Sequence, residues 1–376
     1  MLWVVGSVLV LALLALILFN WALRSKYEPV LARFQKELTE NLDYFCEQQG
    51  VLSADPWFHE PRPEGDAGPL LNAWLPWEPQ KTRPRGSPLT VPAHLPQKAG
   101  DFKDWLSSPV DVSGLDFAWM RTLHAYDRWD LLKSAPVAPG AKIDWLNASL
   151  PHFSDLQLWA KFRLLHGLRT GQPLEAARDV RHLAWLAFRT DTTLGGAIAT
   201  ALLRLERAAY DSMPQPPPDW KPMSAEQLDR MRAILMTSFK FSSMAAPLEV
   251  AKQARRCGAP AVSRCIALGE TAPMAKLLQP YARSEYPEQY AALTEDLAAF
   301  SCPTSLPRTL WERGVTLEEA SQGSGLSPQV VRLGRLPRAL FGPHIAGILL
   351  SAGTPGLERL HEFRATYPAA TPTVRP

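Results

Sequence analysis

Residues 154–210 read SDLQLWAKFRLLHGLRTGQPLEAARDVRHLAWLAFRTDTTLGGAIATALLRLERAAY, and this stretch decides the fold class. Its apolar residues recur at intervals of three and four, the period of an amphipathic helix. Gly171 ends the first helical pattern, and Pro173 stands where the first turn of a new helix accepts a proline. The stretch therefore predicts helices of about 14 to 18 residues joined by short turns, as in antiparallel helical hairpins.

Two capping boxes mark expected helix starts, one at Ser154 with Gln157 and one at Ser224 with Gln227. In such a box the serine accepts from the third helical N–H and the glutamine reaches back to the capping residue. Strand patterns are nearly absent. The hairpins resemble those of helical-repeat proteins such as the tetratricopeptide family, but residues 168–171 have no second copy. The sequence thus predicts an all-α, non-repetitive helical-hairpin domain.

The N-terminal residues 1–23 contain no charged side chain, and Trp3 and Trp21 lie near the two ends of this apolar run. About 20 apolar residues span the hydrocarbon core of a bilayer, and tryptophans favour its interfaces. We expect a transmembrane anchor here, with the lipid bilayer as its partner. A cleaved signal peptide is the alternative, but no basic residue precedes the run and no small-x-small cleavage site follows it.

The side of the membrane on which the rest of the chain lies stays open at this point. Arg24, Lys26, Arg33 and Lys36 all follow the apolar run, and by the positive-inside rule they favour a cytoplasmic domain. However, one helix followed by a large domain is also how many envelope proteins are tethered.

A juxtamembrane amphipathic helix is expected over residues 24–50, ended by Gly50 and packed on the protein's own domain rather than on a partner. Its apolar stripe consists of Leu31, Phe34, Leu38, Leu42 and Phe45.

Residues 51–150 form the next predicted unit, a Pro/Trp-rich irregular arm leading into helices. Ten prolines occur between Pro56 and Pro96, a density that excludes long helices and central strands. Disordered tracts are poor in aromatic residues, so we expect this arm to wrap the helical body and dock its tryptophans. A proline-rich recognition strip or a tryptophan belt at the membrane surface is the alternative. The aromatic and leucine residues concerned are Trp57, Phe58, Leu70, Leu71, Trp74, Leu75 and Trp77.

The remaining boundaries follow from composition. We expect a helical hairpin region over 151–212, a Pro-rich linker over 213–223, a second helical region over 224–365 and a flexible tail over 366–376. The uncharged segment 339–356 favours a buried helix over a second membrane span because its glycines and proline dilute its hydrophobicity.

The composition excludes several function classes. The chain has 40 Lys+Arg and 37 Asp+Glu, a formal net charge of +3, which makes nucleic acid an unlikely partner. The four cysteines include no CxxC pair, so no metal site is expected, and no motif implies a cofactor or a small-molecule ligand.

Cys257 and Cys265 are close enough in sequence for a disulfide in an oxidising compartment. In the cytoplasm all four cysteines would be buried thiols.

Catalytic residues stay unknown, because no nucleophile elbow, phosphate loop, dinucleotide fingerprint or zinc helix occurs. The eight histidines are scattered along the chain. If the protein is an enzyme, its site must be assembled from residues distant in the sequence, and His152, His166 and His182 are the candidate catalytic residues. Each histidine alone is more often a hydrogen-bonded packing residue.

One stretch resembles the helix-turn-helix of small bacterial repressors: residues 314–333, GVTLEEASQGSGLSPQVVRL. Thr316 and Glu319 would form a capping box, Gly325 the turn and Val331 the inward anchor of the second helix. The resemblance implies DNA binding. The stretch departs from the family where Gly323 weakens the first helix and where few polar residues face outward from the second, and a plain helical hairpin is the preferred interpretation.

Together these patterns predict a single-pass bacterial membrane protein that acts as a non-enzymatic scaffold or protein-interaction module. The bacterial origin is inferred from 28 Arg against 12 Lys, a bias typical of GC-rich coding. An enzyme with a site assembled from distant His and acidic residues and a membrane-tethered helix-turn-helix regulator are the two alternatives. The expected partners are the bilayer, through residues 1–23, and a protein.

Overall fold

A computed structural model describes residues 2–77, 84–133, 135–138, 140–145, 148–257, 263–322 and 355–369. The elements within these ranges are helices, with three isolated β-bridges and no strand, which confirms the all-α prediction. Residues 323–354 and 370–376 fall outside these ranges, so residues 339–354 of the uncharged segment and most of the expected tail lie outside the described residues.

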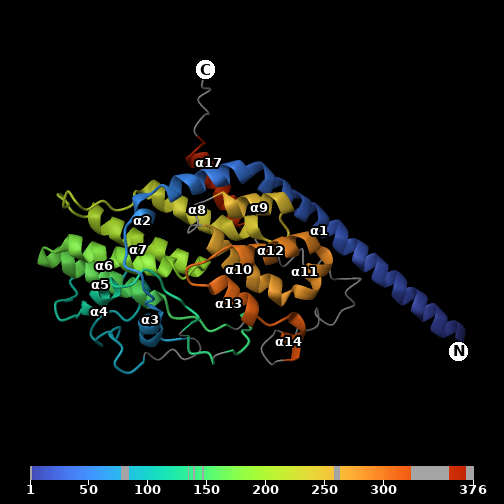
Figure 1. Ribbon diagram of the computed structural model, residues 1–376, viewed down its shortest axis with the longest axis horizontal. Helices are drawn as coiled ribbons and strands as arrows, with labels where there is room; N and C mark the ends of the chain where they lie inside the picture. The colour runs from blue at the N-terminus through green and yellow to red at the C-terminus, as the bar shows by residue number, and fades with distance from the viewer. Residues whose placement is uncertain are drawn as a thin grey trace, which may run out of the picture.

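Helix α1, Leu2–Ser53, joins the expected membrane anchor and the juxtamembrane helix into one continuous element of 52 residues. Among the described residues it is the one helix long and apolar enough to cross a membrane. Figure 1 shows its N-terminal part projecting from the body with no labelled element beside it. The prediction that Gly50 ends the helix is wrong, since the helical backbone continues to Ser53. A glycine inside a helix costs stability without necessarily ending it.

The second part of α1 packs on the body, as its apolar stripe predicts. Phe34, Leu38, Leu42 and Phe45 are buried, and the Phe45 ring stacks on Phe241 with centroids 4.2 Å apart. The partners of this part of α1 are α8 (Ala225–Ser242), α9 (Leu248–Arg256) and α17 (Pro355–Thr366).

Helices α5 (Ser154–Thr170), α6 (Pro173–Phe188) and α7 (Thr193–Asp211) pack against one another as the predicted hairpins. Gly171 ends α5 with φ 72°, a left-handed conformation that glycine adopts without strain, and Pro173 opens α6. The expected capping box at Ser154 is wrong, because the backbone is already helical at Phe153 and the helix has no side-chain cap.

Helix α8 connects the two helical regions, since it contacts α1, α7, α9, α10 and α17. Its predicted capping box is confirmed: Gln227 N donates to Ser224 Oγ at 3.1 Å and Ser224 N donates to Gln227 Oε1 at 2.6 Å. The remaining helices of this region are α10 (Cys265–Leu277), α11 (Gln279–Glu285), α12 (Pro287–Ala299), α13 (Leu306–Arg313) and α14 (Leu317–Gln322).

The described part of the arm over 51–150 wraps the helices, and its own elements are short, as predicted (Figure 1). Trp57 and Trp77 are buried in the body, which removes their rings from any membrane surface. Lys161 of α5 holds the arm by donating to Ala99 O and Phe102 O, both at 2.7 Å. The elements of the arm are α2 (Pro56–His59), α3 (Gly68–Trp74), the 3₁₀ helix η1 (Ala99–Asp101) and α4 (Ala118–Leu123).

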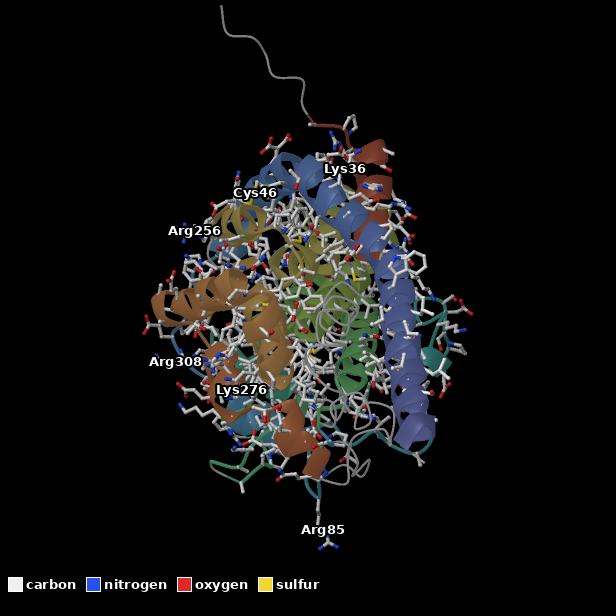
Figure 2. All side chains as sticks on the ribbon, turned by 90° about the vertical axis from the view of Figure 1, so that its right-hand side faces the viewer. Lys36, Cys46, Arg85, Arg256, Lys276 and Arg308 are labelled. Carbon is white, nitrogen blue, oxygen red and sulfur yellow. A yellow bond between two sulfur atoms is a disulfide. The ribbon has the colours of Figure 1, made fainter. Side chains whose placement is uncertain are left out.

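The cysteines form two disulfides, and the Cys257–Cys265 pair permitted by the sequence spacing is wrong. Cys46 of α1 bonds Cys257 at the end of α9, and Cys265 bonds Cys302. Figure 2 shows Cys46 near Arg256, the residue before Cys257. Packing of α1 on α9 brings Cys46 and Cys257, 211 positions apart in the sequence, to a Cα separation of 5.1 Å. Spacing along the sequence cannot predict such a long-range pair.

Candidate functional site

A polar cavity of about 410 Å³ lies between the arm, the end of α4 and one face of α6. We call it the arginine groove. From the arm it is lined by residues 60–63 and by His124, and from the Pro-rich linker by Asp219. Its α6 face consists of Leu174, Ala177, Arg178, Arg181 and His182. Successive positions are three, one, three and one residues apart, so each has a neighbour three or four positions away on the same side of the helix.

The sequence Pro61-Arg62-Pro63 holds one guanidinium in the groove. Pro61 follows the short helix α2 and forces Glu60 into an extended conformation, with φ −62° and ψ 125°. The Arg62 side chain is only 7% exposed and lies 3.7 Å from the ring centroid of Trp185, a cation–π contact. Arg62 Nη2 donates to Trp57 O at 3.1 Å and to Glu60 Oε2 at 3.0 Å.

Burial is the main reason why the pKa of Arg62 is lowered to about 10. Arg189 and Arg181 also lower it, whereas Glu60 and Asp127 raise it. The guanidinium therefore stays charged at neutral pH, in a place where positive charge is only partly balanced.

Arg181 is fixed from behind the groove. It pairs with Glu206, which is fully buried, and its Nη2 donates to Lys221 O at 3.1 Å. Glu206 also accepts from Trp220 Nε1 at 2.9 Å, so the linker is tied to α7 through the same carboxylate. Arg178, one turn earlier on α6, is exposed and has no acceptor among the described residues.

Two histidines meet at the inner end of the groove. The rings of His124 and His182 have centroids 4.8 Å apart, and His182 Nε2 lies 2.9 Å from Leu123 O. Because a carbonyl oxygen only accepts, that nitrogen carries the proton. Burial lowers the pKa of His182 to about 4, and His124 contributes to the shift. His182 is therefore neutral at physiological pH.

His124 connects the groove to a buried ion pair. Its Nε2 lies 3.0 Å from Asp179 Oδ1, an ion pair whenever the imidazole is protonated. Asp179 Oδ2 accepts from Arg163 Nε at 2.7 Å, and both of those side chains are almost completely buried. Arg163 also contacts Glu175 at 3.2 Å. The network places the His124 ring beside Asp179 of α6.

A second cavity, of about 500 Å³, adjoins the arginine groove and shares Glu60, Arg181 and Asp219 with it. Its lining is more apolar. The apolar side chains there are Pro56, Trp57, Pro222 and Met223, and the polar ones not shared with the groove are Asp55, Lys221 and Gln227.

The structure does not bring together the three histidines expected for an enzyme. Only His182 lines the groove. The ring centroids of His166 and Phe117 are 5.2 Å apart, and burial lowers the pKa of His166. His152 N donates to Pro76 O of the arm. The partner of His182 is His124, which is 58 positions away and whose neighbours carry no periodic signal.

The sequence did not reveal Arg62 as a groove residue either, because it also lies far along the chain from the helix that it contacts. Its two flanking prolines predict a rigid extended segment.

Neither of the other candidate sites is assembled within the described residues. Asp191, Cys265 and Cys302 lie within 4.8 Å of one another, but the two sulfurs are bonded together and are not thiolate ligands. The capping box of the helix-turn-helix stretch is present, with Glu319 N donating to Thr316 Oγ1 at 3.2 Å. Gly325, Val331 and the rest of Thr316–Leu333 beyond Gln322 lie outside the described residues.

Comparisons of the chain with protein-family models, with curated proteins and with solved structures find no match.

Proposed function

We propose that this protein is a membrane-anchored interaction module, whose helical body is held on the extracytoplasmic side of a bacterial membrane by one uncleaved helix. The observation that carries the proposal is the continuity of α1. Its N-terminal part is apolar and exposed, with Leu11 at 65% and Leu18 at 63%, whereas Leu38 in the same helix is fully buried in the body. A helix shared between bilayer and body fixes the position of the body at the membrane surface.

The two disulfides support the extracytoplasmic side. Disulfides persist in oxidising compartments, and glutathione and thioredoxin reduce them in the cytoplasm. Every cysteine of the chain is bonded to another, with none free. We give this pairing more weight than the four basic residues after the apolar run, because large domains translocate largely regardless of charge. An extracytoplasmic body also argues against the alternative that the chain is a helix-turn-helix regulator, because such a regulator requires access to DNA.

A binding role is favoured over the enzyme alternative. Helical hairpins offer grooves to partner helices, and the polar groups gathered at the arginine groove are suited to binding. Of His152, His166 and His182, His182 alone lines the arginine groove, so the groove does not gather the three histidines named for the enzyme alternative.

Fractionation of the bacterial membrane tests the anchor. We expect the full chain to stay in the membrane pellet after alkaline carbonate extraction, with an intact mass that includes residues 1–23, and a variant lacking residues 2–23 to be soluble. A mature chain that begins after residue 23 would show a signal peptide instead.

Amine-reactive cross-linking of intact membranes tests the interaction role. We expect the anchored chain to form a discrete adduct of higher mass that the variant lacking residues 2–23 does not form. An anchored chain that stays unlinked at all reagent concentrations would contradict the role as an interaction module.

A further inference from the structure

We propose that the arginine groove binds a soluble organic oxyanion, a carboxylate or a phosphate ester, whose apolar part extends into the adjoining cavity beside Trp57 and Met223. This inference goes beyond anchoring and does not depend on the side of the membrane. The two cavities, of about 410 and 500 Å³, are in the size range of small-molecule sites.

The three guanidinium groups give the groove its chemistry. Arg62 comes from the arm, and Arg178 and Arg181 come from neighbouring turns of α6. The planar fork of a guanidinium matches the two oxygens of a carboxylate or phosphate, and such charge-assisted pairs are the strongest hydrogen bonds in proteins. Glu60 pairs with Arg62 and the buried Glu206 pairs with Arg181, so Arg178 is the lining cation that has no partner among the described residues and is open to a ligand.

Two of the three cations are fixed before any ligand arrives. Arg62 is held by the Trp185 ring and by Trp57 O, and Arg181 is held by Glu206 and by Lys221 O. Their ordering is complete in the free protein, so a bound oxyanion would immobilise only the exposed Arg178. The buried position of Arg62 among other cations also makes a nearby anion favourable.

The lining of the adjoining cavity indicates that the ligand carries an apolar group as well as an oxyanion. A bare inorganic ion would occupy only the polar end, whereas Pro56, Trp57, Pro222 and Met223 offer apolar surface directly beyond Glu60 and Arg181. Burial of apolar ligand surface there adds affinity of about 25 cal/mol per Å² before the costs of binding.

The position of the groove favours a soluble ligand over a lipid headgroup. Figure 1 shows α2, α4 and α6 at the end of the body far from the N-terminus of α1, which would enter the bilayer. A lipid headgroup would have to reach across the whole body to contact Arg178.

Calorimetric titration of the full chain in detergent tests the proposal with phenyl phosphate, inorganic phosphate and phenol. We expect phenyl phosphate to bind, inorganic phosphate to bind about tenfold more weakly or worse, and phenol not to bind. Arg178→Ala should weaken phenyl phosphate binding about fivefold or more, and Asp219→Asn should strengthen it, because one removes a cation and the other an anion. Arg204→Ala is the matched control, since Arg204 is also an exposed helix arginine but pairs with Asp229 outside the groove.

Three results would overturn the proposal. The first is that phenyl phosphate does not bind at millimolar concentration. The others are that wild type and Arg178→Ala bind phenyl phosphate equally well, or that phenyl phosphate and inorganic phosphate bind equally well. A separate experiment compares binding to vesicles of phosphatidylglycerol and of phosphatidylcholine. The groove would bind lipid instead if phenyl phosphate did not bind, and if the wild type but not Arg178→Ala bound phosphatidylglycerol vesicles. The fractionation result stands in all these cases, so failure of the groove and failure of the anchor are distinguishable.

Discussion

At the turn between α6 and α7, Asp191 is buried and has a left-handed backbone with φ 55°. Its Oδ2 accepts from Thr304 Oγ1 at 2.8 Å. Burial raises the pKa of this carboxyl from 3.8 to about 6, more than the Thr304 hydroxyl and Arg189 lower it. Ionisation of Asp191 therefore costs more in the folded chain than in the unfolded one.

The pH dependence of stability follows from that shift. Because the folded pKa lies above the unfolded pKa, Asp191 destabilises the protein progressively as pH rises from about 4 to about 6, and by a constant amount above that range. Asp191→Asn does not ionise and tolerates the left-handed backbone. We expect the variant to gain stability over the wild type across this window, on the order of 2–3 kcal/mol.

Urea unfolding at pH 4, 5, 6 and 7 measures that gain, with Asp104→Asn as the control because Asp104 is exposed. The wild type also carries Asp130, whose pKa burial and Asp66 raise to about 6, so Asp191→Asn removes only part of the pH dependence. Parallel stability curves for the wild type and Asp191→Asn would contradict the assignment.

The helices show how far sequence reasoning reaches at the scale of elements. The helical period, Gly171, Pro173 and the Ser224 capping box are local signals, and each predicted a helix or its end correctly. Two local signals failed. The backbone is already helical at Phe153, so Ser154 does not cap α5, and the helical backbone of α1 continues past Gly50 to Ser53.

The partners of the candidate site could not be predicted in this way. His124 and His182, or Arg62 and Trp185, meet because the arm docks on α6. That docking depends on contacts between residues more than 50 positions apart, for which neither periodicity nor motif spacing gives a signal.

The approach of α10 to the α6–α7 turn depends on one glycine. A Cβ at Gly269 would lie 2.5 Å from Asp191 O, a backbone atom that cannot move aside cheaply. We expect Gly269→Ala to destabilise the protein by about 1–3 kcal/mol, the usual range for overpacking. Gly50→Ala is the matched control, because Gly50 is also helical and has no atom within 4 Å of the new Cβ.

In chemical unfolding, the two alanine variants should change stability in opposite directions. Alanine at position 50 should stabilise by about 0.5–1 kcal/mol, since it favours the helix over glycine. A neutral Gly269→Ala would mean that α10 lies farther from the turn than the structure shows.

At the scale of the whole molecule, two disulfides close loops of very different length. Cys46–Cys257 spans 211 positions and ties α1 to α9, whereas Cys265–Cys302 spans 37. In the chain-entropy model these bonds stabilise by about 5 and about 4 kcal/mol.

Serine replacement of each pair tests that order. We expect loss of Cys46–Cys257 to cost more stability than loss of Cys265–Cys302, because the longer loop restricts the unfolded chain more. Equilibrium unfolding of the two double variants under non-reducing conditions makes the comparison, with each serving as the control for the other. A larger loss for the shorter loop would be inconsistent with this account.

We propose that one helix holds an oxidised helical body outside the cytoplasm. Protease accessibility of a C-terminal tag in intact spheroplasts tests it most directly, with a cytoplasmic protein as the lysis control. We expect external protease to remove the tag before lysis, because two disulfides favour an oxidising compartment for the body. A tag that survives until the spheroplasts are lysed would place the body in the cytoplasm and contradict the claim.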